Sequence, residues 1–433
     1  MSPTSEQIIH QDKNAVSPAI YRTAEIAIER GEGSTVWDYD GKRYYDLASG
    51  IATMAVGHSH PRVIKAVQEQ ATKLMHIGTP VAYTKQYAEM IEALRETMPA
   101  PLSNGKGVLM NSGGEAIEAA IKMARMVTGR QMILAFTGGF HGRGMGALAA
   151  TGSNANYRRG LTSLMVGVQH VPYPSCHKCP FGHGSRATSE CCGTWKQFIR
   201  TQLETLLPQD DLAGILVEPI TGEGGYVVPP DDFLPFLRRI CDRAGAMLIV
   251  DEVQTGLGRT GKWWGFEHSN VIPDIVAMGK AIGGGLPLGG IIAKAELADK
   301  WMPGSHGSTF GGNPMSCAAG METVKIIRDE NLLENAQTVG AQIRAQLMAA
   351  REHIPMLGDV RGRGMMSAVD LVGKTDGPLT AKEFKQVLHD LNDAGIILTK
   401  CGASTLRFIP ALNISAGQAK EAMDIVLNTL SAK

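Results

Sequence analysis

Short apolar runs recur between residues 106 and 318, and they restrict the possible folds more than any other feature of the chain. Helical stretches separate one run from the next. Most of the runs are continuous rather than alternating, so strands formed from them must be covered on both faces. This pattern predicts an α/β fold with a mostly parallel, seven-stranded sheet. The predicted strands are Gly107–Met110, Met132–Phe136, Val166–Val171, Gly214–Val217, Met247–Val250, Ile275–Met278 and Gly290–Ala293.

The segments on either side of this region have a different character. In residues 35–48, Asp40-Gly41 is a favoured hairpin turn between β-branched and aromatic flanks. We expect an N-terminal segment 1–60 that carries this hairpin and joins the small domain, a large domain 61–318, and a C-terminal small α+β domain 319–433. Helices are expected at residues 61–75, 85–97, 321–328, 333–352 and 418–430, and further strands at 361–372 and 396–398.

Charge and cysteine content argue against several classes of protein. The 433 residues include 42 basic and 42 acidic side chains, a balance that indicates neither nucleic-acid nor membrane binding. No apolar run is long enough to span a bilayer, and the first residues lack the basic and apolar regions of a signal peptide. Seven cysteines in a chain of this size do not fit a disulfide framework, so we expect a reducing, cytoplasmic setting.

An acid and a lysine follow two of the predicted strands. Asp251 comes directly after Met247–Val250, and Lys280 follows Ile275–Met278. In open α/β sheets, ligands bind outside the carboxyl ends of the strands. Pyridoxal phosphate requires a lysine that binds it as a Schiff base and an acid that keeps its ring nitrogen protonated. The alternative is a surface ion pair, since such pairs are common.

Two further strand ends carry residues suited to a ligand. Ser112, Gly113 and Gly114 precede a helix, where free backbone N–H groups and the helix dipole favour an anion. The alternative is an ordinary capped helix without a ligand. An anion site is favoured over it because this helix starts from the same sheet as the acid and the lysine. After the next strand, Phe140 is suited to stack on a planar ring and Arg143 to bind a carboxylate. A core phenylalanine and a solvated arginine are the alternatives.

Acidic and basic side chains at three more positions belong to the same pattern. Glu218 and Glu223 follow another buried strand and stand among glycines, which indicates a site loop rather than a plain turn. Arg407 stands between apolar residues near the end of the chain and needs an anionic partner there. That partner is either a carboxylate of the protein, in a structural ion pair, or a carboxylate of the substrate.

Together these motifs resemble the signature of the class III pyridoxal-phosphate aminotransferases. The resemblance covers nearly the whole chain, and within the family it is greatest to 4-aminobutyrate aminotransferases. It implies the aspartate-aminotransferase-like architecture, pyridoxal-phosphate fold type I, with a large and a small domain. The matching stretches are WDYDGKRYYDLASGIATMAVGHSHP, NSGGEA, GGFHGR, EPITGEGG, Asp251–Gly256, Gly258–Gly261, Gly279-Lys280, HGSTFGGNP and LRFIP.

The resemblance also implies how the cofactor is held. Lys280 would carry pyridoxal phosphate and then move the proton, and Asp251 would pair with its ring nitrogen. Thr309 would reach the phosphate bound by a neighbouring subunit, which implies a homodimer or a dimer of dimers. The remaining cofactor-binding residues implied are Ser112, Gly113 and Gly114 for the phosphate, Phe140 and the adjacent His141 for the ring, Gln254 for the ring hydroxyl, and Glu218.

The substrate residues implied by the resemblance are Ile51, Arg143, Glu223 and Arg407. They match a transfer of the amino group from 4-aminobutyrate to 2-oxoglutarate, which gives succinate semialdehyde and glutamate. Decarboxylating relatives usually have glutamine where this chain has Ile51. Other amines remain open, such as 5-aminovalerate, β-alanine, ornithine or a diamine, as does an isomerase or racemase reaction on the same scaffold.

Residues 173–195 resemble an insertion found in only some members of the family. Cys176 and Cys179 followed by Cys191 and Cys192 have spacing typical of metal ligands, and His177 and His183 stand nearby. A zinc ion or an iron–sulfur centre is one reading of this segment. We expect the other, a surface loop of reduced thiols without metal.

Overall fold

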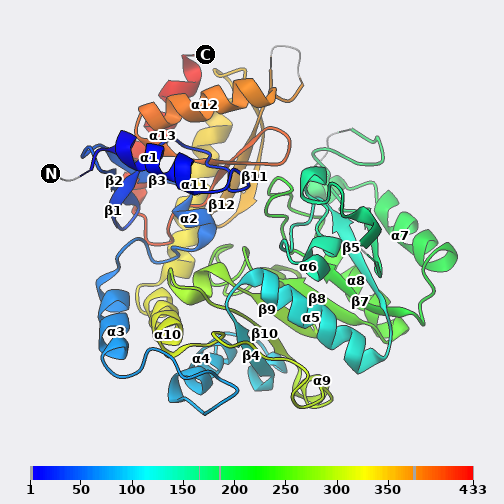
Figure 1. The fold of residues 1–433 in the computed structure, drawn as a ribbon. Coiled ribbons are helices and arrows are strands. Elements are labelled where there is room, and N and C mark those ends of the chain that lie inside the picture. The colour runs from blue at the N-terminus through cyan, green and yellow to red at the C-terminus, as the bar shows by residue number, and fades with distance from the viewer. Residues whose placement is uncertain (1–2, 165, 185–186, 374–376, 433) are drawn as a thin grey trace.

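A seven-stranded sheet forms the centre of the computed structural model, which describes residues 3–164, 166–184, 187–373 and 377–432 (Figure 1). The strand order is β4-β10-β9-β8-β7-β5-β6. Only β10 runs antiparallel to its neighbours, so the predicted fold class is confirmed. The strands are β4 (Lys106–Met110), β5 (Met132–Thr137), β6 (Val168–Pro172), β7 (Leu212–Val217), β8 (Met247–Asp251), β9 (Ile275–Met278) and β10 (Gly289–Ala293).

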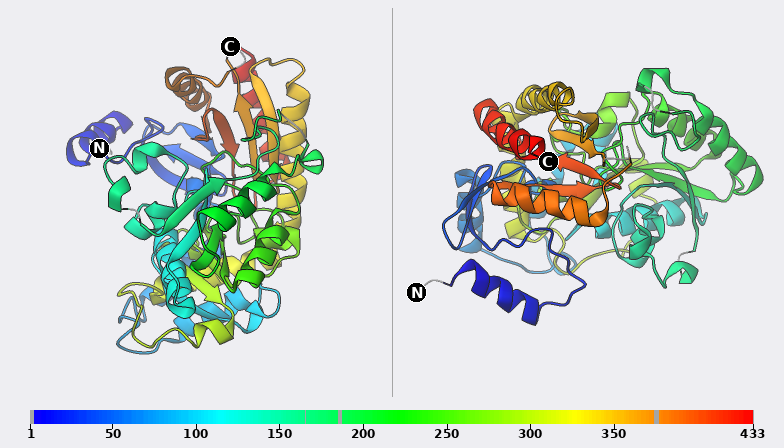
Figure 2. Two further views of the ribbon diagram at one scale, coloured as in Figure 1. Left: turned by 90° about the vertical axis from the view of Figure 1, so that its right-hand side faces the viewer. Right: turned by 90° about the horizontal axis from the view of Figure 1, so that it is seen from above.

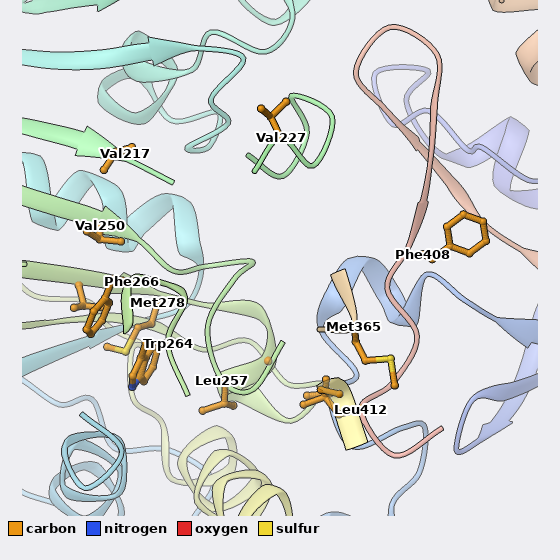
Figure 3. Packing of buried hydrophobic residues seen from close by; sticks show 14 of the residues in the cluster. Val217, Val227, Val250, Leu257, Trp264, Phe266, Met278, Met365, Phe408 and Leu412 are labelled. Carbon is orange, nitrogen blue, oxygen red and sulfur yellow. The ribbon is translucent and has the colours of Figure 1, made fainter. Parts of the chain in front are cut away.

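Both faces of this sheet are buried, as the continuous apolar runs predicted. Along β8, Met247 and Ile249 belong to one hydrophobic cluster, whereas Leu248 and Val250 belong to another. Helix α5 (Gly113–Thr128) covers the first face, and α8 (Phe233–Ala244) packs on β7 and β8 from the second. Figure 3 shows part of the second cluster, with Val250 on its strand. Full burial of each such side chain contributes about 1.5–3 kcal/mol.

Two smaller sheets combine the ends of the chain. Gly41 has φ +85° in the turn between β2 and β3, so the predicted hairpin is confirmed. Strand β13 pairs in parallel with β3, and Figures 1 and 2 show the N-terminal strands beside the C-terminal helices. One sheet has the order β1 (Ile28–Glu32), β2 (Thr35–Asp38), β3 (Arg43–Asp46), β13 (Ile396–Ile397), and the other the order β11 (Leu357–Arg363), β12 (Met366–Leu371), β15 (Thr405–Phe408), β14 (Thr399–Cys401).

The five expected helices are present with different ends, and further helices such as α1 and α12 were not among the expectations. Helix α10 starts at Pro314 rather than at residue 321, because the Asn313 side chain accepts the Ser316 N–H and proline occupies the first turn. This helix is continuous across the expected domain boundary at 318/319, and the division into three segments stays a prediction. Helix α10 spans Pro314–Asp329, and the remaining α-helices are α1 (Ser5–Ala15), α2 (Ser49–Ala52), α3 (Pro61–Ala71), α4 (Lys85–Arg95), α6 (Met145–Ala150), α7 (Thr194–Thr205), α9 (Ala295–Ala298), α11 (Leu332–Ala350), α12 (Ala381–Asp393) and α13 (Ala416–Ser431).

None of the helices in the described ranges combines the length and the apolar character that crossing a membrane requires.

Candidate active site

A cavity lies at the carboxyl ends of the parallel strands, where the sequence predicted a ligand site. Segments that follow β4, β5, β7, β8 and β9 all contribute to it. Most of the predicted cofactor residues therefore meet in one place. The lining residues are Gly113, Gly114, Phe140, His141, Gly142, Glu218, Glu223, Asp251, Val253, Gln254 and Lys280.

Strand alternation explains why Asp251, and not the adjacent Glu252, serves this cavity. Asp251 continues the side of β8 that faces α5, and Glu252 points to the opposite side. There the Glu252 carboxylate accepts the Gly265 N–H at 2.9 Å and the Phe266 N–H at 2.8 Å. Burial raises the pKa of Glu252 to about 7, which those hydrogen bonds partly counteract. Glu252 therefore holds its own loop together and leaves the cavity to Asp251.

Asp251 is oriented by a histidine. Its Oδ2 atom lies 2.7 Å from Nδ1 of His141, and its Oδ1 atom accepts the Val253 N–H at 3.0 Å. Burial by itself lowers the pKa of His141, but the hydrogen bond and the charge of Asp251, with a contribution from Glu218, outweigh burial and raise it. The carboxylate is thereby held in one orientation toward the cavity.

Glu218 joins two loops of the cavity wall. Its carboxylate accepts the Phe140 N–H at 2.7 Å and the Gly222 N–H. Burial raises the pKa of Glu218 to about 7, and the nearby Asp251 acts in the same direction. The side chain lines the cavity and also ties the segment after β5 to the segment after β7.

Lys280 enters the cavity from a tight turn after β9. Its φ of +49° is unusual for a residue with a side chain. The preceding Gly279 permits this path, since a Cβ there would lie 2.9 Å from the Cα of Gly113. The pKa of Lys280 is lowered to about 8, mainly by burial and also by the charge of Arg407, while Asp251 opposes the change. The amine is therefore closer to its neutral, nucleophilic form than a solvated lysine.

The N-terminus of α5 forms an open cradle of backbone N–H groups. Ser112 caps the helix by accepting the Glu115 N–H at 3.2 Å. A Cβ at Gly113 would lie 2.6 Å from a methyl group of Val253, and one at Gly142 would lie 2.9 Å from the Cα of Gly114. Glycines are needed at these positions because the backbones of three loops approach each other closely. A helix start of this kind favours a phosphate.

A second group of side chains lies beside this cavity. The Tyr157 hydroxyl donates to Oε1 of Glu223 at 2.7 Å, and the Arg143 guanidinium lies 4.7 Å from the centre of the Tyr157 ring. The same guanidinium lies 5.5 Å from the centre of the Phe140 ring. Tyr157 thus brings Arg143 and Glu223 together.

Arg407 is buried on β15, with 7% of its surface exposed. Its Nε atom donates to Oγ1 of Thr399 at 2.7 Å. The guanidinium lies near the Tyr226 hydroxyl, which donates to Oε1 of Gln254 at 2.7 Å. Within the described ranges, no carboxylate forms an ion pair with Arg407. The backbone connects this region to Glu223, because the Gly402 N–H donates to the Glu223 carbonyl at 2.7 Å.

Five predicted site residues are absent from the cavity lining: Ser112, Arg143 and Arg407, described above, and Ile51 and Thr309. Ile51 is 43% exposed in the short helix α2 and has φ +60°. Thr309 is exposed on the loop before α10, next to Phe310, which is also exposed. Thr309 is therefore uncovered in the single chain, and its contact with the phosphate of a neighbouring subunit stays a prediction.

Four residues of this region were not among the predicted site residues. Gly142 stood in the GGFHGR stretch and Val253 directly after Asp251 and Glu252, so both were close to recognised signals. Tyr157 and Tyr226 come from separate loops and carry no local sequence signal for a role at the site.

Chemically, the cavity suits a planar, phosphate-bearing aldehyde. Lys280 supplies an amine of lowered pKa, Asp251 a buried carboxylate, and the N-terminus of α5 an anion cradle. These groups come from separate strand ends but line one cavity. The residues present therefore fit pyridoxal phosphate, whose aldehyde, ring nitrogen and phosphate need these three kinds of partner.

Comparison with known proteins agrees with this chemistry. The family model described as Aminotransferase class-III matches residues 16–430. The 5-aminovalerate aminotransferase DavT of Pseudomonas aeruginosa is 36% identical over 430 residues, with 98% of each chain covered. The 4-aminobutyrate aminotransferase GabT of Escherichia coli is 36% identical over 430 residues, covering 98% of this chain and 97% of GabT.

A solved structure extends the agreement to the fold. An amine transaminase from an uncultivated Pseudomonas species, in its pyridoxal-phosphate-bound form, matches with a TM-score of 0.87 and 30% identity over 96% of both chains. The chain therefore belongs to the class III aminotransferases, with pyridoxal-phosphate fold type I and pyridoxal 5′-phosphate as its cofactor.

Proposed function

We propose that the protein transfers the amino group of 4-aminobutyrate, or of a similar ω-amino acid, to 2-oxoglutarate, giving succinate semialdehyde and glutamate. The observation that supports this proposal is the surroundings of Glu223, which lines the cavity, bonds Tyr157 beside Arg143, and accepts a backbone hydrogen bond from the C-terminal segment that carries Arg407. Arg143 is exposed, Arg407 is buried without a carboxylate partner among the described residues, and Glu223 is held by Tyr157. The similarity to GabT supports the same substrate.

The two substrates differ in the carboxylates they bring. Both 4-aminobutyrate and 2-oxoglutarate have a carboxylate remote from the reacting carbon, and Arg143 binds it in both half-reactions. Only 2-oxoglutarate has a second carboxylate, beside the keto carbon, and Arg407 binds that one. Leaving the buried Arg407 unpaired while 4-aminobutyrate reacts costs several kcal/mol, and Glu223 pairs with it at that stage.

The cofactor residues act on defined atoms. When bound, pyridoxal phosphate withdraws electrons from the carbon that carries the substrate nitrogen and so makes its C–H bond acidic. The N-terminus of α5 with Ser112 would hold the phosphate, and Asp251, oriented by His141, would keep a proton on the ring nitrogen. Gln254, bonded to Tyr226, would hold the ring hydroxyl, and Phe140 would supply an apolar face for the ring.

Lys280 is the proton-transfer residue of this proposal. Burial lowers the pKa of its Nζ amine to about 8, so a larger fraction of the amine is neutral than for a solvated lysine. With the cofactor bound, the neutral amine would accept the proton from the substrate carbon and later give it back. Such transfers by a positioned base contribute on the order of 10²–10⁴ in rate.

The active unit is proposed to be at least a dimer. Thr309 is exposed, and exposed apolar side chains accompany it, since Phe310 is 61% exposed and stacks on His76 at 4.7 Å between ring centres. Val81, at 78% exposure, and Tyr83 are also uncovered in a single chain. Apolar surface of this kind is typical of subunit interfaces.

A panel of amines assayed against 2-oxoglutarate tests the proposed substrate. We expect 4-aminobutyrate to give the highest kcat/KM, with 5-aminovalerate second because DavT is equally similar to this chain. Reaction of ornithine with 4-aminobutyrate inert would overturn the substrate proposal. Turnover of an amino acid enantiomer without any keto acid would indicate a racemase instead.

Replacing Arg143 with methionine is expected to raise KM for both 4-aminobutyrate and 2-oxoglutarate by about 10- to 100-fold. This is the effect of losing one charge-assisted hydrogen bond to the substrate carboxylate. The KM of butylamine, which has no carboxylate, should stay unchanged. Arg159→Met is the matched control, since Arg159 is exposed in the neighbouring loop and its side chain bonds Asn156. Equal effects on 4-aminobutyrate and butylamine would contradict the role of Arg143.

Replacing Tyr157 with phenylalanine removes the hydroxyl that holds Glu223 away from Arg407. Glu223 should then pair with Arg407 more often, so KM for 2-oxoglutarate is expected to rise about tenfold while KM for 4-aminobutyrate does not rise. The effect should vanish when Glu223→Gln is already present, which a double-mutant cycle measures. An additive pair of effects would show that Tyr157 acts by another route.

A further inference from the structure

Four of the seven cysteines have no part in the proposed reaction. All seven thiols are free, and Cys241, Cys317 and Cys401 lie singly in the buried core, where they act as small apolar side chains. The other four stand in residues 174–193, here named the cysteine loop, which connects β6 to α7. They line one cavity together, and they are Cys176, Cys179, Cys191 and Cys192.

Local turns bring the two ends of the cysteine loop together. The Gly182 N–H donates to the Cys179 carbonyl at 3.1 Å, and Gly182 has φ +77°, so the chain reverses directly after Cys179. Gly193, with φ +71°, starts α7 directly after Cys192. As a result the Sγ atoms of Cys179 and Cys192 lie 3.9 Å apart.

The remaining sulfurs extend this pair. Cys176 interacts with Cys191, and Cys192 interacts with Cys191 as well as with Cys179. Polar groups of Thr194, at the start of α7, lie close to the Cys192 sulfur. All four sulfurs thus form one connected set, and donors from the start of α7 favour negative charge on it.

We propose that Cys176, Cys179, Cys191 and Cys192 bind one zinc ion as four thiolates. Tetrahedral zinc with Zn–S bonds of about 2.3 Å places neighbouring sulfurs about 3.8 Å apart. The 3.9 Å between Cys179 and Cys192 matches this edge, whereas a disulfide would require about 2.05 Å. Each thiol releases its proton to solvent as it binds the metal.

Zinc binding requires a small closure of the cysteine loop. Within the described ranges, the possible metal-ligand atoms of His389, Asp390 and Asp393 on α12 all lie within 4.8 Å of one another. The sulfurs of the cysteine loop do not meet that criterion. The Cys176–Cys191 pair must therefore rotate toward the Cys179–Cys192 pair to share one ion.

A closed four-cysteine site leaves no open position on the metal, so its role is structural. The cysteine loop starts at the wall of the active site, because the Tyr173 hydroxyl donates to the Glu218 carbonyl at 3.0 Å. At the other side of the loop, Nε2 of His177 lies 3.8 Å from Oδ2 of Asp370. Asp370 pairs with Arg361, and Nε of Arg361 donates to the Gly225 carbonyl at 2.8 Å. Zinc would thereby stiffen the segment that carries Glu218 and Glu223.

Metal analysis of the holoenzyme, purified with reductant and without chelator, tests the site. We expect about one zinc ion per chain, and loss of at least 90% of it in Cys179→Ser and in Cys192→Ser. Cys241→Ala is the control that keeps zinc, since Cys241 is buried in α8 away from the loop. If a serine variant fails to fold, titration of wild type with an organomercurial should release the zinc and lower the thermal midpoint.

Three results would overturn the zinc site. The first is less than about a tenth of a zinc ion per chain after incubation with zinc sulfate and desalting. The second is iron with acid-labile sulfide in place of zinc. The third is loss of four free thiols under non-reducing, metal-free conditions, with the mass change of two disulfides. Zinc content is measured apart from turnover, so none of these results depends on which amine the enzyme uses.

Discussion

Replacement of Lys280 by alanine is expected to abolish turnover of every amine while leaving the fold and some cofactor binding intact. The variant lacks the amine that carries the cofactor and the base that moves the proton, and proton transfer alone accounts for on the order of 10²–10⁴ in rate. The cradle at the N-terminus of α5 and the carboxylate of Asp251 remain. Succinate semialdehyde production and the cofactor content after gel filtration measure the two effects.

Lys300→Ala is the matched control for this experiment. Lys300 is exposed beyond α9, and its replacement should change neither rate nor cofactor content. Wild-type-like turnover in Lys280→Ala would falsify the assignment of the catalytic lysine. Loss of turnover accompanied by loss of thermal stability would instead indicate a structural role.

Replacement of Asp251 by asparagine is expected to lower kcat about a hundredfold to a thousandfold, the usual effect of losing one preorganised electrostatic partner. The amide cannot hold a proton on the ring nitrogen as a carboxylate does. The pKa of His141 should fall as well, because the hydrogen bond and charge of Asp251 are what raise it against burial. Steady-state kinetics measure the first effect, and NMR of the histidine ring the second.

The neighbouring acid provides a sharp control. Glu252 follows Asp251 in the chain, but it faces the other side of the sheet and accepts hydrogen bonds from Thr255, Gly265 and Phe266. Glu252→Gln should therefore lower the thermal midpoint and leave kcat within a few-fold of wild type. The opposite pattern, with kcat lost in Glu252→Gln and kept in Asp251→Asn, would refute the assignment of the ring-nitrogen partner.

Local sequence patterns were enough to predict the framework of the protein. The seven strands of the large sheet overlap the predicted segments, most of which are continuous apolar runs because strands covered on both faces favour apolar residues along their length. The hairpin at Asp40-Gly41 follows from the turn preference of those two residues. Residues directly after the strands, including Asp251 and Lys280, then meet at one edge because parallel strands end on the same side.

The start of α10 shows that the hydrophobic pattern alone did not predict where this helix begins, since the helix was expected from residue 321 and starts at Pro314. Its Asn313-Pro314 start is a recognisable helix signal, but the first turns contain small and polar residues that weaken the apolar periodicity. The helix therefore extends through the position where a domain boundary was expected. Hydrogen bonds and the cap, rather than hydrophobic pattern, determine where it begins.

Contacts between distant segments were decided by the tertiary structure alone. The hydrogen bond from Tyr157 to Glu223 and that from Tyr226 to Gln254 join loops with no shared local pattern. The pairing of β13 with β3 connects the two ends of the chain in the same way. Such contacts depend on where packing places each loop and on which rotamer each side chain then adopts.

The sequence by itself determined the strands, their order along the chain and the residues that stand at their ends, because short-range periodicity dictates these features. Only the tertiary structure decided that Glu223 is held by Tyr157 rather than paired with Arg407, and that the sulfurs of Cys179 and Cys192 lie 3.9 Å apart. Side-chain direction in a loop follows from the packing of several segments at once, and no single stretch of residues encodes it.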